Sequence, residues 1–308
     1  MDTQTLYIIG NGFDLHHGLP TQYKHFKAFL NKVDREVFDW VEAYVPAEED
    51  WSDLELALAY LDTDSVVSDL EGFLASYSDE NWSDAGHHDF QYEIDRVATG
   101  LSRTLQSRFG DWIRSIVIPD RSSAHGLLST LDRSALFLTF NYTSTLNKLY
   151  NVPAENVLHI HGEGAEPSSE LILGHAWTPD ERTSLQQGLD GESADHRVME
   201  ALGVLDDYFE QTFKPSEQII KLNAGFFSDL RSVTHVTVLG HSLSVVDRAY
   251  FLALVEALEG RPVIWTLAVR SHDEDPHKIQ RLSDFGVPRG QIYCKLWSEL
   301  SRHGEVSA

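Results

Sequence analysis

The sequence predicts an α/β fold: a Rossmann-like, doubly wound and mainly parallel sheet that carries large helical insertions. Six short runs rich in Val, Ile, Leu and aromatic residues predict strands covered on both faces. These runs are residues 6–10, 135–140, 157–161, 235–240, 263–269 and 291–296. Helical patterns lie between them, and this alternation is typical of a parallel sheet flanked by helices. A seventh run, residues 170–174, is a shorter candidate strand.

The spacing of the first two runs predicts a helical insertion. About 125 residues separate them, far more than one crossover helix needs. Apolar residues recur at helical spacing over residues 26–44 and again over residues 90–116, where they predict one long helix. Between these segments, residues 52–55 (Ser-Asp-Leu-Glu) match a capping box ahead of another helix. We therefore expect a helical insertion over residues 22–130.

A second helical insertion is expected over residues 176–230. An apolar stripe at helical spacing runs through residues 198–213. The chain contains no repeat, no low-complexity tract and no interdomain linker. We therefore expect a single α/β domain over residues 1–308, with both insertions packed on its sheet.

Composition and charge exclude several classes of partner. The 308 residues include 24 Lys and Arg against 48 Asp and Glu, a formal charge of −24. That charge repels phosphate backbones and anionic membranes, so we expect neither a nucleic acid nor a membrane as partner. The single cysteine, Cys294, cannot form an internal disulfide, and its apolar surroundings predict a buried strand thiol. Without a signal peptide or an apolar run of transmembrane length, a cytoplasmic protein is expected.

The first predicted strand ends in a glycine-rich turn, Gly10-Asn11-Gly12, that leads directly into a helical pattern. Glycines let a backbone approach a ligand closely, and the next helix adds the positive end of its dipole. The turn therefore suggests a phosphate-binding loop and a nucleotide ligand. It is not the complete dinucleotide fingerprint, because Leu15 stands where the third glycine would be. A plain tight turn is the alternative.

Polar residues follow the other predicted strands at the edge where ligands bind in open α/β sheets. Asn141 and His161 are the main candidates there. Asn141 could instead cap a helix starting near Thr143, and His161 could be a core histidine, although Gly162 suggests a backbone kept clear for a ligand. A metal site formed by His159, His161 and His175 is a further alternative. His16 and His17, at the start of the first helix, suit a surface role as well as a ligand contact.

Four separated motifs give the chain a resemblance to the AbiH family of bacterial abortive-infection proteins. They are Gly-Asn-Gly-Phe-Asp-Leu-x-x-Gly-Leu-Pro-Thr from Gly10, Phe-Asn-Tyr-Thr from Phe140, His-Ile-His-Gly from His159 and Gly-His-Ser-Leu-Ser-x-x-Asp from Gly240. The match spans about residues 6–251. That family is in turn remotely similar to the sirtuin-like NAD-binding fold, in which comparable segments occur in the same order.

The resemblance implies a role for each matching residue. Asn141 corresponds to the asparagine that positions the nicotinamide ribose and a water molecule, and His161 to the histidine that acts as base. The residues implied in binding the nucleotide are Gly10, Asn11, Gly12, Asp14, Tyr142, Gly240, Ser242 and Asp247. The paired cysteines of a sirtuin zinc ribbon are absent, since the chain has one cysteine, and Tyr142-Thr143 replaces an Ile-Asp pair. These departures favour simple NAD hydrolysis over protein deacylation.

The function implied is anti-phage defence by depletion of NAD, which is cleaved to nicotinamide and ADP-ribose. NAD is the substrate, and no metal or added cofactor is expected. Nicotinamide leaves a cationic ribose as a neutral molecule, so an asparagine that orients the sugar and a histidine that activates water suffice in principle. Unregulated cleavage would be toxic, so we expect inhibition by the insertion helices, by homo-oligomerisation or by a partner protein of a defence system.

A serine hydrolase is the main alternative. Residues 235–244 predict a strand, a sharp turn and a helix, and Gly240-His-Ser-Leu-Ser resembles a nucleophile elbow centred on Ser242. Asp275 or Asp284, with His277 or His303, would complete a triad in the order typical of that fold. Ser244 stands where the elbow normally has its second glycine. A third alternative is a nucleotide-sensing module of a defence complex that performs no catalysis.

Overall fold

The computed structural model describes residues 4–74, 88–165, 171–177, 182–187 and 195–301. Contacts divide the chain into two compact units. Unit 1 comprises Met1–Gln22, Ile113–Leu171 and Ser216–Ala308, and unit 2 comprises Tyr23–Trp112 and Ile172–Pro215. The two segments of unit 2 overlap the insertions expected over residues 22–130 and 176–230. Each unit is therefore assembled from segments that lie far apart in the sequence.

Unit 1 contains a six-stranded, wholly parallel sheet with the order β3-β2-β1-β4-β5-β6. Its strands are β1 (Gln4–Ile9), β2 (Leu136–Thr139), β3 (Val157–His159), β4 (Val233–Leu239), β5 (Ile264–Val269) and β6 (Ile292–Leu296). All six predicted strands are confirmed, and so is the Rossmann-like α/β class. The chain winds outward from β1 to β3 and then in the other direction from β4 to β6. The crevice at which such sheets bind ligands therefore lies between β1 and β4.

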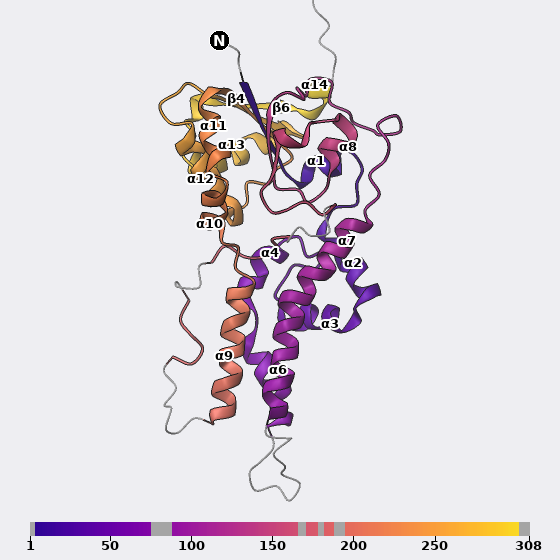
Figure 1. The fold of residues 1–308 in the computed structure, drawn as a ribbon, viewed down its shortest axis with the longest axis vertical. Helices are drawn as coiled ribbons and strands as arrows, with labels where there is room; N and C mark the ends of the chain where they lie inside the picture. The colour runs from indigo at the N-terminus through magenta and orange to yellow at the C-terminus, as the bar shows by residue number, and fades with distance from the viewer. Residues whose placement is uncertain (1–3, 75–87, 166–170, 178–181, 188–194, 302–308) are drawn as a thin grey trace, which may run out of the picture. The chain divides into compact units, whose positions relative to one another are not determined.

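Helices cover the sheet on both sides (Figure 1). Those of unit 1 are α1 (Asn11–His16), α8 (Thr145–Tyr150), α10 (Ser216–Leu222), α11 (Ala224–Asp229), α12 (Arg248–Ala257), α13 (Asp275–Asp284) and α14 (Trp297–Ser301). Side chains alternate between the two faces of a strand. Because helices cover both faces, every residue from Leu6 to Ile9 is buried.

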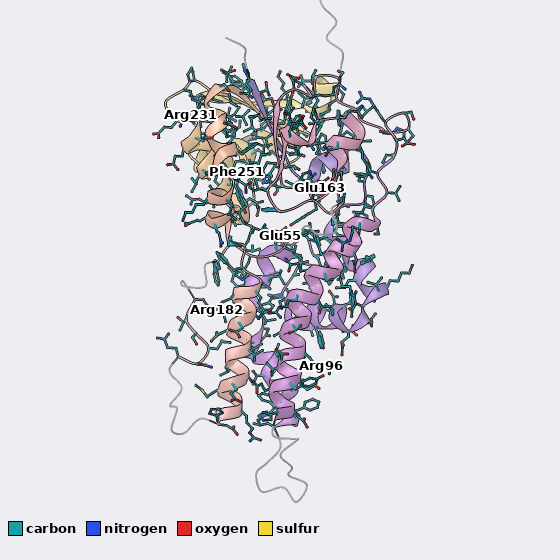
Figure 2. All side chains as sticks on the ribbon, viewed as in Figure 1. Glu55, Arg96, Glu163, Arg182, Arg231 and Phe251 are labelled. Atoms are coloured by element: carbon teal, nitrogen blue, oxygen red, sulfur yellow. The ribbon has the colours of Figure 1, made fainter. Side chains whose placement is uncertain are left out.

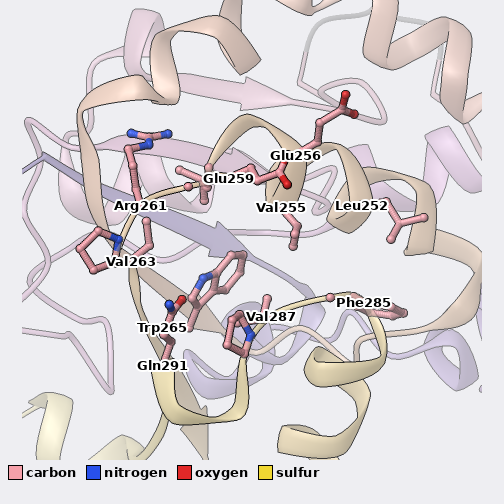
Figure 3. Close-up of a pocket in the computed structure, with 15 residues that line it drawn as sticks. Leu252, Val255, Glu256, Glu259, Arg261, Val263, Trp265, Phe285, Val287 and Gln291 are labelled. Carbon is pink, nitrogen blue, oxygen red and sulfur yellow. The ribbon is translucent and has the colours of Figure 1, made fainter.

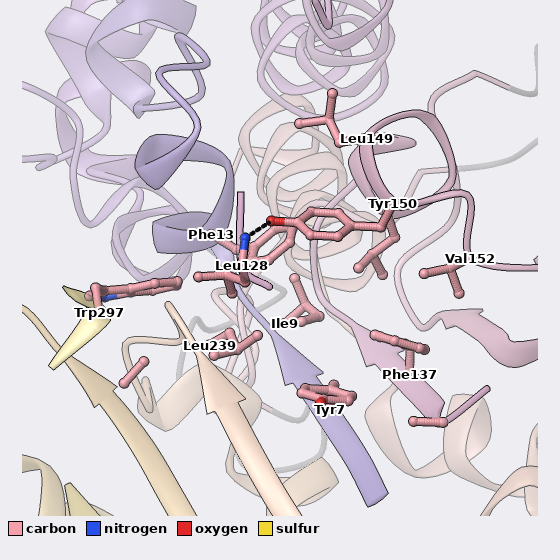
Figure 4. Packing of buried hydrophobic residues seen from close by; sticks show 13 residues of the cluster. Tyr7, Ile9, Phe13, Leu128, Phe137, Leu149, Tyr150, Val152, Leu239 and Trp297 are labelled. Atoms are coloured by element: carbon pink, nitrogen blue, oxygen red, sulfur yellow. Dashed lines mark hydrogen bonds between the residues drawn. The ribbon is translucent and has the colours of Figure 1, made fainter. Parts of the chain in front are cut away.

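One face of the sheet packs against α1, α8 and α14 in a single apolar cluster (Figure 4). Tyr7 stacks on Phe137 of the neighbouring strand, with ring centroids 5.0 Å apart. Ile9 and Leu239 lie in the same cluster, and Phe13 of α1 packs on Tyr150 of α8. This core fixes α1 directly behind the glycine turn that follows β1.

Unit 2 is helical over its described residues. Its helices are α2 (Tyr23–Val33), α3 (Arg35–Tyr44), α4 (Leu54–Ala57), α5 (Thr63–Leu70), α6 (Asp89–Thr99) and α9 (His196–Gln211), and α7 (Leu105–Ser115) crosses its boundary with unit 1. The long helix expected over residues 90–116 is confirmed as α6 and α7, joined by a π-helical segment at Gly100–Thr104. A Cβ on Gly100 would lie 2.3 Å from the ring of Trp40, so this ring packs closely against the helix at the glycine.

The helical pattern over residues 26–44 is confirmed, and two other local expectations in this part of the chain were wrong. The apolar pattern at 26–44 forms two helices, because the Asp34 carboxylate accepts a hydrogen bond from Val37 N and starts α3. The capping box at 52–55 does not form: Asp53 precedes α4, and Ser52 Oγ donates instead to Glu48. Residues 171–174 form no strand, and only His175 makes an isolated bridge, to Phe213. Residue 170 lies outside the described residues.

A partly buried ion pair joins the two segments of unit 2. Lys214 Nζ, whose side chain is fully buried, donates to Glu55 Oε2 at 2.6 Å, and Tyr23 Oη donates to the other carboxylate oxygen of Glu55. Glu55 is labelled in Figure 2. Glu55 therefore holds a tertiary contact between distant segments rather than a helix cap. None of the described helices is long and apolar enough to cross a membrane.

Candidate functional site

The ten predicted site residues all belong to unit 1 and follow the carboxyl ends of four neighbouring strands. Gly10, Asn11, Gly12 and Asp14 follow β1, and Asn141 and Tyr142 follow β2. His161 comes after β3, while Gly240, Ser242 and Asp247 come after β4. Because these strands are parallel and adjacent, the four segments meet at one edge of the sheet. His175, by contrast, belongs to unit 2.

The turns after β1 and β4 are packed directly against one another. Gly12 N donates to Gly240 O at 2.8 Å, and Gly10 N donates to Leu239 O at 3.0 Å. A Cβ on Gly12 would lie 2.7 Å from Gly240 O, and one on Gly240 would lie 2.2 Å from Phe13 N. Gly240 also has a φ of 73°, which favours glycine. The glycines thus allow two backbones to approach each other, and the Gly12 amide already has an acceptor within the protein.

Asn141 is held in place by its backbone. Its N–H donates to Thr139 Oγ1 at 3.1 Å, and its carbonyl accepts from His159 Nδ1, also at 3.1 Å. The alternative role as a helix cap is wrong, because α8 begins at Thr145 with Ser144 at the N-cap position. Asn141 is 7% exposed, so its side chain is presented inside the site and not to open solvent.

Asp14, in the helix α1 that follows β1, is almost completely buried. Its Oδ2 accepts a hydrogen bond from Thr143 Oγ1 at 2.6 Å, and the Thr145 hydroxyl lies 3.0 Å from that of Thr143. Burial disfavours the charged carboxylate and raises the pKa of Asp14 to about 6, while hydrogen bonding to Thr143, Thr145 and Asn141 acts in the opposite direction. The carboxyl group therefore titrates close to neutral pH beside the Asn141 amide.

Asp247 lies between two buried imidazoles. Its Oδ1 is 3.8 Å from His161 Nε2, and its Oδ2 is 3.4 Å from His241 Nε2. His161 is 3% exposed and His241 is 4% exposed, while the Asp247 side chain retains 13%. Asp247 is set in this position by the short 3₁₀ turn Val245–Asp247, which Ser244 Oγ caps by accepting from Val246 N.

Aromatic rings form the walls around the two histidines. The ring of Phe140 is 5.4 Å from His161 and 4.4 Å from His241, both edge to face. Tyr250 of α12 lies 5.4 Å from His161, and Tyr142 lies 6.1 Å from it on a tilted plane. Such walls lower the local dielectric, which strengthens electrostatic interactions within the site.

The backbone conformation of the turn after β3 accounts for the glycine at position 162 without a ligand. Gly162 has a φ of 90°, so glycine is required there by the backbone and the interpretation as a space kept clear for a ligand is unnecessary. Glu163, labelled in Figure 2, accepts from Ser144 Oγ at 2.8 Å. Burial lowers the pKa of His159, and the nearby Glu163 charge opposes that effect.

His16 and His17 do not both lie on the surface. His17 is buried: its Nδ1 donates to Phe13 O at 2.7 Å, and its Nε2 accepts from Tyr150 Oη at 2.6 Å. Burial lowers the pKa of His17 to about 4. His16 is half-buried and stacks on Trp297 with ring centroids 4.3 Å apart. Both histidines therefore serve to hold α1 in unit 1.

The geometry gives the nucleophile elbow little support. In an elbow the strain falls on the nucleophile, yet here the positive φ after β4 falls on Gly240 and on Leu243, at 59°. Ser242 is exposed. Asp275 bonds to His272, and Asp284 accepts from Gln280. Within the described residues no hydrogen bond joins Ser242 to His277, and His303 lies outside them.

The described residues provide neither a cluster of metal ligands nor a reactive thiol. No group of three or more His, Cys, Asp or Glu residues there is arranged to hold a metal ion. Cys294 lies in a strand, β6, as predicted, but it is half-buried and not fully buried, and burial raises its pKa to about 11. Such a thiol is a poor nucleophile at neutral pH.

A separate cavity of about 690 Å³ lies at the start of β5, where the chain leaves α12 (Figure 3). Trp265, Val255 and Phe285 contribute to its largely apolar wall. Arg261 lines the same cavity, but its guanidinium already donates to the carbonyls of Leu230, Arg231 and Ala257. None of the predicted site residues lines it, because they follow the carboxyl ends of the strands and this cavity lies beside the amino end of β5.

Sequence reasoning missed His241 and Thr143 as site residues. His241 stands within the motif that singled out Ser242, but the signal for its role is its distance to Asp247, six residues further on. Thr143 belongs to the Phe-Asn-Tyr-Thr motif, but the signal for its role is its hydrogen bond to Asp14 on another element. Selection of every polar residue that closely follows a predicted strand would have included both His241 and Thr143.

Fold and site together define a doubly wound α/β protein that gathers buried Asn, Asp and His side chains at the carboxyl edge of its sheet. The chain belongs to the AbiH family, since the family model for bacteriophage abortive infection AbiH matches residues 6–269. That match runs from β1 to the end of β5 and contains all four motifs. Neither the curated proteins nor the solved structures gave a match. The remoter likeness to the sirtuin-like fold stays a prediction.

Proposed function

We propose that this protein acts in abortive infection by binding NAD at the β1/β4 crevice and hydrolysing it to nicotinamide and ADP-ribose. The observation that carries the proposal is the meeting of Asn141, His161 and the glycine turns at the carboxyl edge of a sheet with the strand order 3-2-1-4-5-6. That edge is where doubly wound sheets bind dinucleotides. Membership of the AbiH family supports the defence role.

In this proposal Asn141 orients the ribose and the attacking water, and His161 accepts a proton. The water oxygen forms a bond to C1′ of the nicotinamide ribose. The bond from C1′ to the pyridine nitrogen breaks with both electrons going to nicotinamide, which leaves neutral, and a water proton passes to His161. Oriented groups of this kind contribute mainly by positioning and by general base catalysis. The fixed backbone of Asn141 supports such a role, because a positioning group must itself be held.

The burial of the site supports a restrained enzyme. Asn141 and His161 are less than 10% exposed, so a dinucleotide can reach them only after some local opening. The Gly12 amide would also have to exchange its Gly240 acceptor for a phosphate oxygen, or leave the phosphate to other amides of the turn. An effector whose activity would be toxic to its own cell is expected to have such a closed resting form.

The test is release of nicotinamide from NAD, followed by chromatography for the purified full chain and four variants. Asn141→Ala and His161→Ala should each reduce release by at least about 100-fold, a typical effect of removing a positioned catalytic group. Asn156→Ala and His125→Ala are the matched controls, because both residues lie in unit 1 and neither follows the carboxyl end of a strand. Asn156 is half-buried at the amino end of β3, and His125 is exposed. Circular dichroism and thermal unfolding would establish that all four variants fold.

Cleavage that survives in folded Asn141→Ala would overturn the assigned mechanism. If wild type releases no nicotinamide, calorimetry with NAD separates two cases: binding without cleavage favours the restrained or sensing form, and no binding contradicts the NAD assignment. Labelling by a serine-reactive fluorophosphonate that disappears in Ser242→Ala would instead support a serine hydrolase.

A further inference from the structure

Asp247 lies close to two histidines, and their surroundings are not equivalent. Leu243 N donates to His241 Nδ1 at 2.9 Å, so this ring nitrogen is an acceptor and carries no proton. The proton of neutral His241 is then on Nε2, the atom that lies 3.4 Å from Asp247 Oδ2. His241 therefore presents an N–H group to the carboxylate.

A second proton on His241 would break its bond to the backbone. Protonated Nδ1 can no longer accept from Leu243 N, and that buried amide would be left without its acceptor. The turn cannot easily move to compensate, because Leu243 is itself held at a φ of 59° and its carbonyl accepts from Arg281 Nη1 at 3.2 Å. The turn that follows β4 thus fixes the orientation of the His241 ring, with Nδ1 toward the backbone and Nε2 toward Asp247.

We propose that the negative charge of Asp247, which His241 orients, keeps on His161 the proton that this histidine takes up. The shortest distance between the groups is 3.8 Å, from His161 Nε2 to Asp247 Oδ1, within the range where an opposite charge favours the ionised form. Asp247 and His241 are positioning residues, since neither touches the reacting atoms. The catalytic meaning of this arrangement rests on the proposed NAD hydrolysis, whereas the electrostatic pairing does not.

Among the described residues, the other groups that contact His161 or lie beside it in the chain have different roles. Phe140, Tyr142 and Tyr250 face it with aromatic rings, and the Glu163 carboxylate is bonded to Ser144 and acts on His159. His159, two residues earlier, has its Nδ1 committed to Asn141 O. Asp247 is therefore the carboxylate placed to balance a positive charge on His161.

The test measures the titration of His161 directly, by NMR of the full chain labelled in its histidine rings. The chain has 15 histidines, so the His161 signals are assigned by their loss in His161→Gln. In Asp247→Asn the pKa of His161 should fall by about one unit or more, because removal of the negative charge favours neutral imidazole. Asp284→Asn, an exposed carboxylate of α13 in the same unit, is the matched control and should leave the titration unchanged.

Two variants of His241 test whether this residue orients Asp247. His241→Gln keeps an N–H donor near the position of Nε2 and should retain most of the wild-type titration of His161. His241→Asn keeps only an acceptor near Nδ1 and should shift the titration toward that of Asp247→Asn. Rescue by the glutamine would not be expected if His241 only filled space.

The outcomes separate this proposal from the proposed function. A His161 titration that is the same in wild type and in folded Asp247→Asn overturns the charge pairing, whatever the enzyme does. A shifted titration in a protein that neither binds nor cleaves NAD supports the pairing and contradicts the NAD assignment. If the protein cleaves NAD, the acidic limb of the pH profile of kcat/KM should also move to lower pH in Asp247→Asn, because the pKa of His161 is lower in that variant.

Discussion

Asp14 is the residue whose burial has the clearest consequence for stability. In the unfolded chain its carboxyl group titrates near 3.8, and in the folded protein its pKa is raised to about 6, mainly because of burial. The folded state therefore binds the proton more tightly than the unfolded state does. The stabilisation due to this proton is complete below pH 3.8 and is lost as pH rises through about 6.

Replacement of Asp14 by asparagine should remove this pH dependence. Asparagine keeps an oxygen that can accept from Thr143 Oγ1 but carries no charge. We expect the free energy of unfolding of Asp14→Asn, relative to wild type, to increase by about 1 to 3 kcal/mol between about pH 4 and pH 8. Urea unfolding at both pH values measures it, and a constant difference would contradict a raised pKa for Asp14.

At the scale of residues, the sequence predicted which side chains would meet but not how they pair. Asn141, His161 and Asp247 could be selected because they follow buried strands, and parallel strands bring such positions to one edge. The bond from Thr143 to Asp14 and the distance from His241 to Asp247 depend on side chain directions and on the approach of separate elements. No local pattern encodes them.

The turns after β1 and β4 are the pair of elements that shape the site. They touch through backbone atoms at Gly10, Gly12 and Gly240, and a side chain at any of the three would come closer than 3.0 Å to the opposite turn. The requirement for glycine in this motif therefore has a packing cause that holds whether or not a phosphate binds.

Gly12→Ala should consequently destabilise the fold. Its Cβ would lie 2.7 Å from Gly240 O and 2.8 Å from Gly240 Cα, and an overpacked contact of this kind costs about 1 to 3 kcal/mol. Gly290→Ala is the control, since a Cβ there would meet no atom within 4 Å and should change stability by less than about 0.5 kcal/mol. Equal denaturation midpoints for the two variants would show that the turns are not tightly packed. A loss of NAD affinity in a Gly12 variant can be assigned to the phosphate loop only after the loss of folding stability in that variant has been taken into account.

Strands were predicted better than the starts of helices. Each strand of a buried parallel sheet is a short continuous apolar run, so its signal is local. The start of a helix depends on which of several polar residues finds its partner. Asp34 interrupts an otherwise continuous apolar pattern, and Ser52 bonds to Glu48 while Glu55 pairs with Lys214, 159 residues away.

At the scale of the whole molecule, the chain's charge of −24 bears directly on the proposed substrate. NAD carries a net negative charge at neutral pH, so the protein's field opposes its approach. NADP carries an additional phosphate and is opposed more strongly. Salt screens such repulsion, because the Debye length falls from about 30 Å at 0.01 M to about 8 Å at 0.15 M.

The kcat/KM for NAD should therefore rise over this range of ionic strength, and that for NADP should rise more steeply. The effect belongs to the encounter step, so kcat itself should change little. Initial rates measured in sodium chloride at constant pH provide the test. A kcat/KM that falls with salt would indicate that a local cationic site outweighs the overall charge.

The division into two units could be predicted only in outline. Long separations between strands indicated where the insertions begin, but not that segments 23–112 and 172–215 fold together. Their association depends on contacts such as the packing of α6 on α9 and the bond from Ser102 Oγ to Gln211. Residues so far apart in the sequence leave no periodic signal of their contact.

Incubation of the purified full chain with NAD, followed by chromatography of the products, tests the central claim most directly. The proposed chemistry predicts nicotinamide and ADP-ribose in equal amounts, formed by wild type and by Asn156→Ala but not by Asn141→Ala. Intact NAD after prolonged incubation, together with no detectable NAD binding by calorimetry, would contradict the claim that this edge of the sheet is a site for NAD.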